Sequence, residues 1–407
     1  MIAKSSTPIR KKTVVLITSS APFGMSEIWF QAEVRELQKS HNVILAPIWP
    51  RGTPQLWPGT LFRSGGRPKI RAFSVLRILV TSSTARKMLT ECRKTSNLRT
   101  GGKCVIAVLV ALQWSIDFSK SELEICHVHA TTVGAPAIAA VVLAERLRVS
   151  SSATAHRGDI LRHSPISALR QITLIRAISE RAKRRLADLG VNSVVLKFGA
   201  VDFVLSDPPQ HFGERLQCVA VGHLIARKGH VRAIRMVNES IKGGLNVELD
   251  IFGVGPLKEE LLAEVDRLGL RGKVRFQGMM AHPKLLAELS SKRWNVLIHT
   301  SIQSGEDGEG IPVAVLEAAA CGVAIIASDS GATAEFVQDG KNGFLISASD
   351  ESIAVEMGLR ALKILSANAL LRDQISKVAR DSVQHYLASN TVHEMKVALA
   401  AMSESEC

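Results

Sequence analysis

Short apolar runs alternate along the chain with longer stretches whose apolar residues recur at helical spacing. Runs of about four to eight apolar residues between turn residues are typical of buried strands, and a period of about 3.6 residues is typical of amphipathic helices. This alternation predicts parallel sheets covered by helices on both faces. In the first half the predicted strands are residues 13–20, 42–49, 125–130, 151–156, 171–179 and 193–199, and the predicted helices are residues 26–40, 135–149 and 180–190.

A proline-rich segment, "SDPPQHFGERL" at residues 206–216, interrupts the alternation and predicts a linker. Strands and helices then resume, and the chain is predicted to be helical from Glu351 onward. We therefore predict two α/β domains, each with its own sheet, and a ligand site in the cleft between them. The predicted strands of the second half are residues 216–224, 246–253, 273–278, 295–301, 323–329 and 342–347, and its helices include residues 256–270, 282–292 and 311–321.

Basic residues are concentrated in the first half. Residues 1–205 contain 30 lysines and arginines against 12 acids, whereas residues 206–407 contain 21 against 25. Residues 63–103 hold eleven basic residues and one acid, Glu91. This stretch is either a solvated basic face or a contact with an anionic membrane or acceptor, where each basic residue near the surface contributes about 1 kcal/mol. Aromatic residues make up only 4% of the chain, which argues against a platform that stacks single-stranded nucleic acid.

The cysteine pattern and the apolar runs indicate the cellular compartment and whether the chain spans a membrane. No two of the six cysteines have C-x-x-C spacing, which favours reduced thiols in a cytosolic protein. The run "VVLIT" near the N-terminus is too short for the apolar region of a signal peptide. The run "VIAVLVAL" at residues 105–112 is far below the roughly 20 residues of a membrane span. We expect a cytoplasmic protein that does not span the membrane but is able to lie on it.

Two loops follow predicted strands of the second half. "FGVGPLKEEL" contains Gly253 and Gly255, but Lys258 occupies the third glycine position of a dinucleotide fingerprint, so a tight packing turn is favoured. "VGHLIARKGH" places Arg227 and Lys228 just beyond a strand end. A lysine there is a suitable point charge for a phosphate, although paired basic residues are also common on surfaces.

The stretch "GEGIPVAVLEAAACG" predicts a buried helix, because residues 311–321 have no polar face apart from Glu317. Pro312 indicates that the helix begins near Gly310, where backbone N–H groups offer a site for phosphate. A buried carboxylate must be hydrogen-bonded, since leaving it unpaired costs several kcal/mol. Glu317 is therefore either a structural carboxylate or an acceptor for ligand hydroxyls.

A second carboxylate, Glu309, lies eight residues before Glu317. At a rise of 1.5 Å per residue the two are roughly 12 Å apart if both are near-helical. Glycosidase carboxylates lie about 5–5.5 Å or 6.5–9.5 Å apart, so the pair does not fit a glycosidase. The separation suits one extended ligand with hydroxyls at both ends and phosphates between them, which is the shape of a nucleotide-sugar.

These residues resemble the signature of the retaining GT-B glycosyltransferases of family 4, a Glu, seven residues and a second Glu in an E-G-x-P helix. The resemblance extends to "APFGMSEIWFQAEVREL", as in the branch of exopolysaccharide and colanic-acid enzymes with a Ser-Glu loop. It also covers "HVHATTVGAPAIAA", "SSATAHRGDI", "LKFGAVDF" and "FGVGPLKEEL". It implies two Rossmann-like domains facing a cleft: residues 1–205 with a C-terminal helix at about 386–407 crossing back, and residues 206–385.

The resemblance also implies roles for individual residues. The catalytic and acceptor-facing residues would be Glu309, at the hydroxyls of the transferred sugar, with His129, His156 and Asp159. The donor would be held by Lys228, Arg227, His223 and Gly310 at the diphosphate, Glu317 at the ribose, and Gly278 and Met279 beside the base. The acceptor-side loop would contain Gly24, Ser26 and Glu27.

His223 departs from the family pattern, which usually has an arginine five positions before the lysine. Histidine carries at most a partial charge near neutral pH and lacks the guanidinium fork. Three alternatives stay open. Arg227 takes the place of the usual arginine, His223 binds the diphosphate in its protonated form, or the activity is weakened. His129 and His156 also have the alternative of being ordinary histidines at strand ends.

The expected function is transfer of a sugar, with retention, from a UDP- or GDP-sugar to a glycan or lipid-linked acceptor in surface-polysaccharide assembly. The expected enzyme needs no cofactor and no metal, in line with the absence of a D-x-D motif, and binds no nucleic acid. A nucleotide-sugar 2-epimerase of the same architecture is one alternative. A non-catalytic protein that binds nucleotide-sugars is another.

Overall fold

The computed structural model describes residues 11–404 apart from residues 24–29, 51–53, 55–56, 62–70, 94–97, 157–165, 205–214, 292 and 304–309. The described residues form two compact units. Unit 1 comprises the residues up to Ile178, then Ala182–Gly199, and those from Thr391 onward. Unit 2 comprises Ser179–Arg181 and Ala200–Asn390. Most of the predicted linker lies outside the described residues.

Unit 1 is built on a seven-stranded sheet in the order β3-β2-β1-β4-β5-β6-β7, and every pairing in it is parallel. Its inner strands are buried on both faces, which is why they read as continuous apolar runs. The strands are β1 Thr13–Thr18, β2 Asn42–Pro47, β3 Thr60–Leu61, β4 Ile125–Ala130, β5 Ser150–Ala155, β6 Leu174–Ala177 and β7 Val194–Val195.

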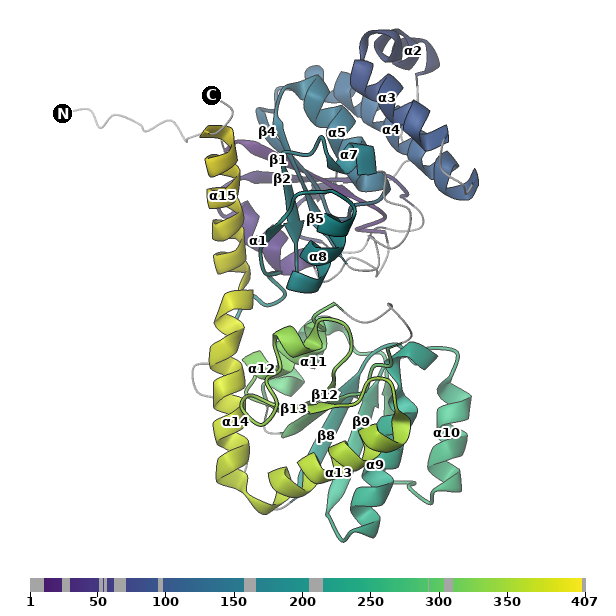
Figure 1. Ribbon diagram of the computed structural model, residues 1–407, viewed down its shortest axis with the longest axis vertical. Helices are drawn as coiled ribbons and strands as arrows, with labels where there is room; N and C mark the ends of the chain where they lie inside the picture. The colour runs from purple at the N-terminus through teal and green to yellow at the C-terminus, as the bar shows by residue number, and fades with distance from the viewer. Residues whose placement is uncertain are drawn as a thin grey trace, which may run out of the picture. The chain divides into compact units, whose positions relative to one another are not determined.

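Helices cover this sheet (Figure 1). Three of them, α2, α3 and α4, come between β3 and β4 and pack on one another, and α3 and α4 also pack on α5. The pattern-based prediction assigned no elements to this part of the chain. The helices are α1 Gln31–Gln38, α2 Ala72–Thr81, α3 Ser83–Arg93, α4 Leu98–Ser119, α5 Ala135–Leu147 and α7 Ile166–Leu169; α8 Glu180–Asp188 lies at the boundary of the two units.

Helix α4 contains a window, Gly101–Ser119, that is long and apolar enough to cross a membrane, and 56% of it is buried inside the protein. Val108, Ala111 and Leu112 are fully enclosed in the core of unit 1. Burial of this kind is typical of a core helix.

Unit 2 contains a six-stranded parallel sheet in the order β10-β9-β8-β11-β12-β13. The predicted α/β class with two parallel sheets is therefore confirmed. The strands are β8 Leu216–Val221, β9 Val247–Phe252, β10 Val274–Gly278, β11 Val296–His299, β12 Ala324–Ser328 and β13 Phe344–Ile346.

Two helices of unit 2 begin at residues whose side chains cap them. Asp350 accepts a hydrogen bond from the N–H of Ile353 and starts α13, and Asn368 does the same for Leu371 and starts α14. The helices are α9 His230–Lys242, α10 Lys258–Arg267, α11 His282–Leu289, α12 Val313–Ala320, α13 Glu351–Ala367 and α14 Ala369–Ser382, with 3₁₀ turns η2 Ala226–Lys228, η3 Thr333–Glu335 and η4 Val383–Tyr386.

The last helix, α15 Ala388–Glu404, packs on unit 1 beside α1 (Figure 1). Glu33 of α1 anchors this region. It forms a two-pronged ion pair with Arg176 of β6 (2.6 and 2.9 Å), and it accepts hydrogen bonds from the Gly199 N–H (2.8 Å) and the Thr391 hydroxyl (3.1 Å). Both charged side chains are almost completely buried. This network ties α15 to the sheet of unit 1.

Candidate functional site

Three adjacent strands of unit 2 end level with one another. The register pairs Val221 of β8 with Phe252 of β9, and Phe252 with Gly278 of β10. Backbone hydrogen bonds continue beyond the strands, from the Gly222 N–H to the Phe252 oxygen (2.9 Å) and from the Gly253 N–H to the Gly278 oxygen (2.8 Å). The loops that follow β8, β9 and β10 are therefore neighbours at the carboxyl edge of the sheet, where parallel sheets bind ligands.

The glycine turn after β9 packs against the loop after β8. A β-carbon on Gly253, whose φ is 150°, would lie 1.9 Å from the Gly222 oxygen. A β-carbon on Gly255 would lie 2.4 Å from the Leu224 oxygen. The glycines thus allow two backbones to touch, which agrees with the prediction of a packing turn rather than a dinucleotide site.

Lys228 is held in this loop by contacts on both sides. It ends the turn η2, and the next residue, Gly229, has φ 61° and leaves no room for a β-carbon beside the Thr300 oxygen. The Thr300 hydroxyl donates to the Gly229 oxygen (2.9 Å), and the Ile302 N–H donates to the Arg227 oxygen (2.8 Å). The backbone that carries Arg227 and Lys228 is therefore fixed at the end of β8.

The side chains of this loop differ in exposure. His223 and Arg227 are exposed, whereas Lys228 is partly buried and lies against Gly222. His230, which opens α9, is buried below the same loop, and burial lowers its pKa to about 4. The sequence interpretation did not single out His230. His230 is therefore neutral near pH 7, and the positive charge of this loop comes from Arg227 and Lys228.

Glu317 lies buried on α12, as predicted, and its Oε1 is 2.6 Å from Nε2 of His282. His282 opens α11, and its side chain is 34% exposed. The sequence interpretation missed His282, which is 35 residues away, because nothing in the local pattern marks the contact. Oε1 of Glu317 therefore has a partner within the protein, and that partner, His282, is partly exposed to solvent.

The start of α12 lies next to this carboxylate in sequence. Pro312 is the N-cap with extended backbone and no side-chain hydrogen bond, and the first intrahelical bonds run from the N–H groups of Val315 and Leu316 to the Pro312 oxygen. The N–H groups of Val313 and Ala314 precede these bonds and so have no acceptor within the helix. Gly310 precedes the cap, in line with the predicted helix start.

The loop after β10 contains the residues predicted to border the base. Gly278 has φ 72°, a conformation that favours glycine, and accepts the hydrogen bond from Gly253. Met279 is 68% exposed. The structure therefore brings Gly278 and Met279 to the same sheet edge as Lys228.

In unit 1, His129 is enclosed by its own sheet. Register pairs it with Ser152 of β5, and its Nδ1 lies 2.7 Å from the Ser152 hydroxyl while its Nε2 lies 3.1 Å from the Thr154 hydroxyl. Its ring stacks on Phe30 at 5.7 Å. Burial lowers the pKa of His129 well below its usual value. This geometry favours the alternative of a structural histidine over one that faces a substrate.

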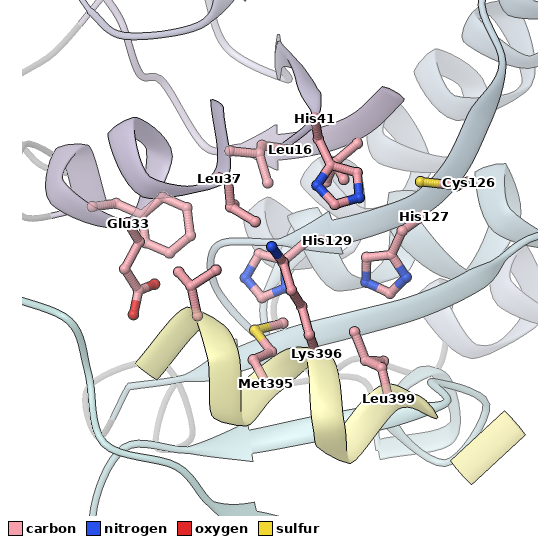
Figure 2. A pocket seen from close by; sticks show the side chains of 13 residues that line it. Leu16, Glu33, Leu37, His41, Cys126, His127, His129, Met395, Lys396 and Leu399 are labelled. Carbon is pink, nitrogen blue, oxygen red and sulfur yellow. The ribbon is translucent and has the colours of Figure 1, made fainter. Parts of the chain in front are cut away.

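Figure 2 shows that His127 and His129 point from β4 into a cavity beneath α15. The cavity has a volume of about 100 Å³. Met395, Lys396 and Leu399 of α15 line the opposite wall. The cavity belongs to the packing of α15 on unit 1, so it is not the predicted donor site.

His156 follows β5 and is partly buried. Its ring meets that of Phe198 edge-on at 6.0 Å. Burial, together with the positive charge of Arg176, lowers its pKa to about 3, so the imidazole is neutral near pH 7. An imidazole with so low a pKa carries no positive charge near pH 7 and is a weak proton acceptor.

Several predicted residues lie outside the described part of the chain, so their placement stays a prediction; these are Glu309, Asp159, Gly24, Ser26 and Glu27. Among the residues that the structure does describe, no three or more His, Cys, Asp or Glu side chains group together in a way that could hold a metal ion.

Solved structures identify the fold. The chain aligns over 96% of its length with the whole (100%) of HepE from Anabaena, solved in complex with UDP and glucose, at a TM-score of 0.64 and 13% identity. The two Rossmann-like units, each with a parallel sheet, thus form the GT-B fold. The predicted fold class is confirmed.

The family match concerns unit 2. Residues 205–381 match the family model described as glycosyl transferases group 1. One relative is the GDP-mannose-dependent alpha-(1-6)-phosphatidylinositol monomannoside mannosyltransferase of Mycolicibacterium smegmatis. Part of the chain is 31% identical to it over 147 residues, which cover 36% of this chain and 38% of that protein. It is 28% identical, over 172 residues, to the putative colanic acid biosynthesis glycosyltransferase WcaL of Escherichia coli K12, covering 42% and 41%. These matches span less than half the length of either relative.

Proposed function

We propose that this protein is a glycosyltransferase that moves a sugar, with retention of anomeric configuration, from a nucleoside-diphosphate sugar to an acceptor. The observation that carries the proposal is the fixed loop with Lys228 at the sheet edge of unit 2, within the domain that matches the glycosyl transferases group 1. A rigid loop holds a cation in place before the ligand arrives, so less entropy is lost on binding.

We propose that the donor lies along the carboxyl edge of the sheet of unit 2. Lys228, assisted by Arg227, His223 and the helix start at Gly310, would hold the diphosphate, and Glu317 would bind the ribose hydroxyls. Lysine is a suitable point charge for phosphate, and the N–H groups at the start of α12 add a partial positive charge. Gly278 and Met279 would border the base.

The hydrogen bond between Glu317 and His282 supports the ribose role. A buried carboxylate needs donors, and in this protein Oε1 has the partly exposed His282. Ribose hydroxyls would supply further donors to the carboxylate when the donor binds. His282 would keep Glu317 in one orientation, which makes it a positioning residue.

For the reaction itself, we propose a front-face displacement. The bond from the anomeric carbon to the donor phosphate breaks, and a bond to the acceptor oxygen forms on the same face. The leaving phosphate oxygen takes the acceptor proton. Glu309 would bind the transferred sugar, and His156 and Asp159 of unit 1 would face the acceptor together with the loop at Gly24, Ser26 and Glu27.

The donor base and the acceptor class follow from the relatives only as proposals. HepE was solved with UDP, and the Mycolicibacterium relative is named as GDP-mannose-dependent, so the proposed donor is a UDP- or GDP-sugar. A relative named for phosphatidylinositol monomannoside and one named for colanic acid support a lipid-linked glycan acceptor in surface-polysaccharide assembly. We propose that the reaction takes place at the cytoplasmic face of a membrane and needs no divalent metal.

A thermal-shift panel with UDP, GDP and their sugars tests donor binding. At least one should raise the unfolding midpoint, and Lys228→Ala should reduce that shift without changing the midpoint of the unliganded protein. Lys242→Ala is the matched control, because Lys242 is an exposed lysine at the far end of α9. No shift with any nucleotide would contradict the proposal.

A transfer assay then separates the enzyme classes. Glu309→Ala should abolish both transfer and donor hydrolysis while the fold is kept, and full activity in this variant would exclude the mechanism. Inversion at C2 of the donor without an acceptor would identify an epimerase instead. Nucleotide binding without any turnover would identify a non-catalytic protein, the alternative suggested by His223.

A further inference from the structure

Helix α2 presents apolar side chains on two faces. Val75 is buried, and Ile78 and Leu79 pack with it against the core of unit 1. On the other face, Phe73 is 85% exposed and Val80 is 65% exposed. Apolar residues occupy most of the circumference of α2 apart from a polar strip with Ser74, Arg77 and Thr81. An apolar helix face is normally covered, so the exposed face of α2 lacks an occupant in the part of the chain that the structure describes.

The exposed side chains form one continuous stripe. Residues in a helix are about 100° apart, so Phe73, Leu76 and Val80 lie within an arc of about 60°. Leu76 is 59% exposed. Arg77 lies about 40° beyond Phe73, just outside this arc, and is also exposed. Contiguous exposed apolar residues bordered by polar ones mark an interaction surface, whereas single ones do not.

The stripe is fixed to a rigid support. At the start of α2 the N–H of Arg71 donates to the Gln113 side chain (2.9 Å), which in turn donates to Asp117 (3.1 Å) inside α4. At its end the Arg86 guanidinium donates to the backbone oxygens of Leu79 and Val80. The first and last turns of α2 are therefore held by side chains from neighbouring helices. Figure 1 shows α2 on the outer side of α3 and α4, away from the sheet of unit 1.

The surroundings of the stripe carry positive charge. Arg71, Arg77, Arg86 and Lys87 are all exposed, and the sequence contains no acidic residue from residue 71 to residue 90. A cationic border around Phe, Leu and Val side chains is the composition of a helix that lies in a membrane interface. Anionic headgroups attract such a border, and the apolar stripe enters the headgroup–acyl boundary.

We propose that α2 is a membrane-docking element that places Phe73, Leu76 and Val80 in the surface of an anionic bilayer while the neighbouring arginines and lysine contact lipid phosphates. A stable protein–protein interface buries about 800 Å² per partner, far more than three side chains supply, whereas a bilayer accepts a narrow stripe. The proposal concerns attachment and goes beyond the transfer reaction. It would bring unit 1 to a lipid-linked acceptor.

Co-sedimentation with vesicles tests it on the full chain. The vesicles contain phosphatidylcholine with about one-third phosphatidylglycerol, or phosphatidylcholine alone. The double variant Phe73→Ser/Leu76→Ser should weaken binding to the anionic vesicles at least about tenfold, because two large apolar side chains no longer enter the interface. Leu370→Ser is the matched control, since Leu370 is 74% exposed on α14 of unit 2, and it should bind as the wild type does.

A charge variant gives an independent measurement. Arg77→Glu/Lys87→Glu should weaken binding to anionic vesicles severalfold, and vesicles of phosphatidylcholine alone should bind the wild type less than the anionic ones. The midpoints of thermal unfolding and the nucleotide-induced shifts should stay unchanged in both double variants. Wild type that does not bind anionic vesicles, or a Phe73→Ser/Leu76→Ser variant that binds as well as Leu370→Ser, would overturn the proposal. Nucleotide shifts report on the donor site separately, so failure of one proposal does not mimic failure of the other.

Discussion

The two units each bury a glutamate, but they compensate its charge in different ways. In unit 1, Glu33 accepts four hydrogen bonds, two from Arg176 and one each from Gly199 and Thr391, and all partners belong to the fold. In unit 2, Glu317 has the contact with His282, whose ring is partly exposed. A carboxylate surrounded by donors of its own fold suits a structural role. A carboxylate whose partner faces solvent suits an exchangeable ligand.

Histidines extend this contrast and give the largest expected effect. In unit 1, burial lowers the pKa of His127 to about 4, that of His156 to about 3 and that of His129 well below its usual value. Among the described histidines of unit 2, His230 has a pKa lowered to about 4. As pH falls below about 6.5, the unfolded chain takes up protons that the folded protein refuses, so each such histidine removes up to about 1.4 kcal/mol of stability per pH unit until its folded pKa is reached.

Unit 1 should therefore lose stability faster than unit 2 between about pH 6.5 and pH 4. Hydrogen exchange followed by mass spectrometry, corrected for the intrinsic pH dependence of exchange, checks this on β4 and β5 against β8 and β9. Earlier loss of protection in unit 2 would contradict the comparison.

The next largest effect concerns the ion pair of unit 1. Glu33→Ala leaves Arg176 buried without its carboxylate, which should lower the free energy of unfolding by about 3–5 kcal/mol. Denaturant titration measures the change. Glu33→Leu combined with Arg176→Met should recover part of the loss, because neither charge then stays buried alone. A double variant that is less stable than Glu33→Ala would show that the network acts as more than an ion pair.

Glu317→Gln should affect donor binding more than stability, whereas Glu33→Ala affects stability. The amide keeps the size of the side chain, so the free energy of unfolding should change by about 1 kcal/mol or less. Donor affinity should fall by about 10–100-fold, since the proposed charged acceptor for the ribose hydroxyls is lost. Calorimetric titration with the nucleotide identified in the thermal-shift panel measures this. A large loss of stability with unchanged affinity would make Glu317 a structural carboxylate like Glu33.

The smallest effect isolates the contribution of α15. Thr391→Val removes one donor to Glu33 and keeps the side-chain shape, so it should cost about 1 kcal/mol. The change in the denaturant midpoint measures it. Thr391→Ser, which retains the hydroxyl, is the control and should be closer to the wild type.

The sequence predicted the strands of both sheets well because buried parallel strands read as apolar runs. The sequence pattern predicted no elements between β3 and β4. The short strand β3 has two residues, and the apolar runs within α2 and α4 are too continuous to show a helical period. Helical order there depends on contacts among these helices and with α5, which local spacing does not encode.

The site shows the same limit. Pattern alone placed Glu317 on a buried helix and Lys228 beyond a strand end, and both positions agree with the structure. His282 and His230 could not be predicted, since each acts through a neighbour distant in sequence or through burial. His129 illustrates the converse, because a histidine at a strand end looks available until the next strand supplies Ser152 and Thr154.

The bond between Thr391 and Glu33 joins residues 358 positions apart. At a synthesis rate of about 5–20 residues per second, the first of them leaves the ribosome roughly 20–70 s before the second. During this interval the nascent unit 1 lacks α15, and the side chains that line the cavity beneath it have no cover from that helix. The order of synthesis therefore makes unit 1 the last of the two to be completed, with a period in which its apolar face is open to chaperones.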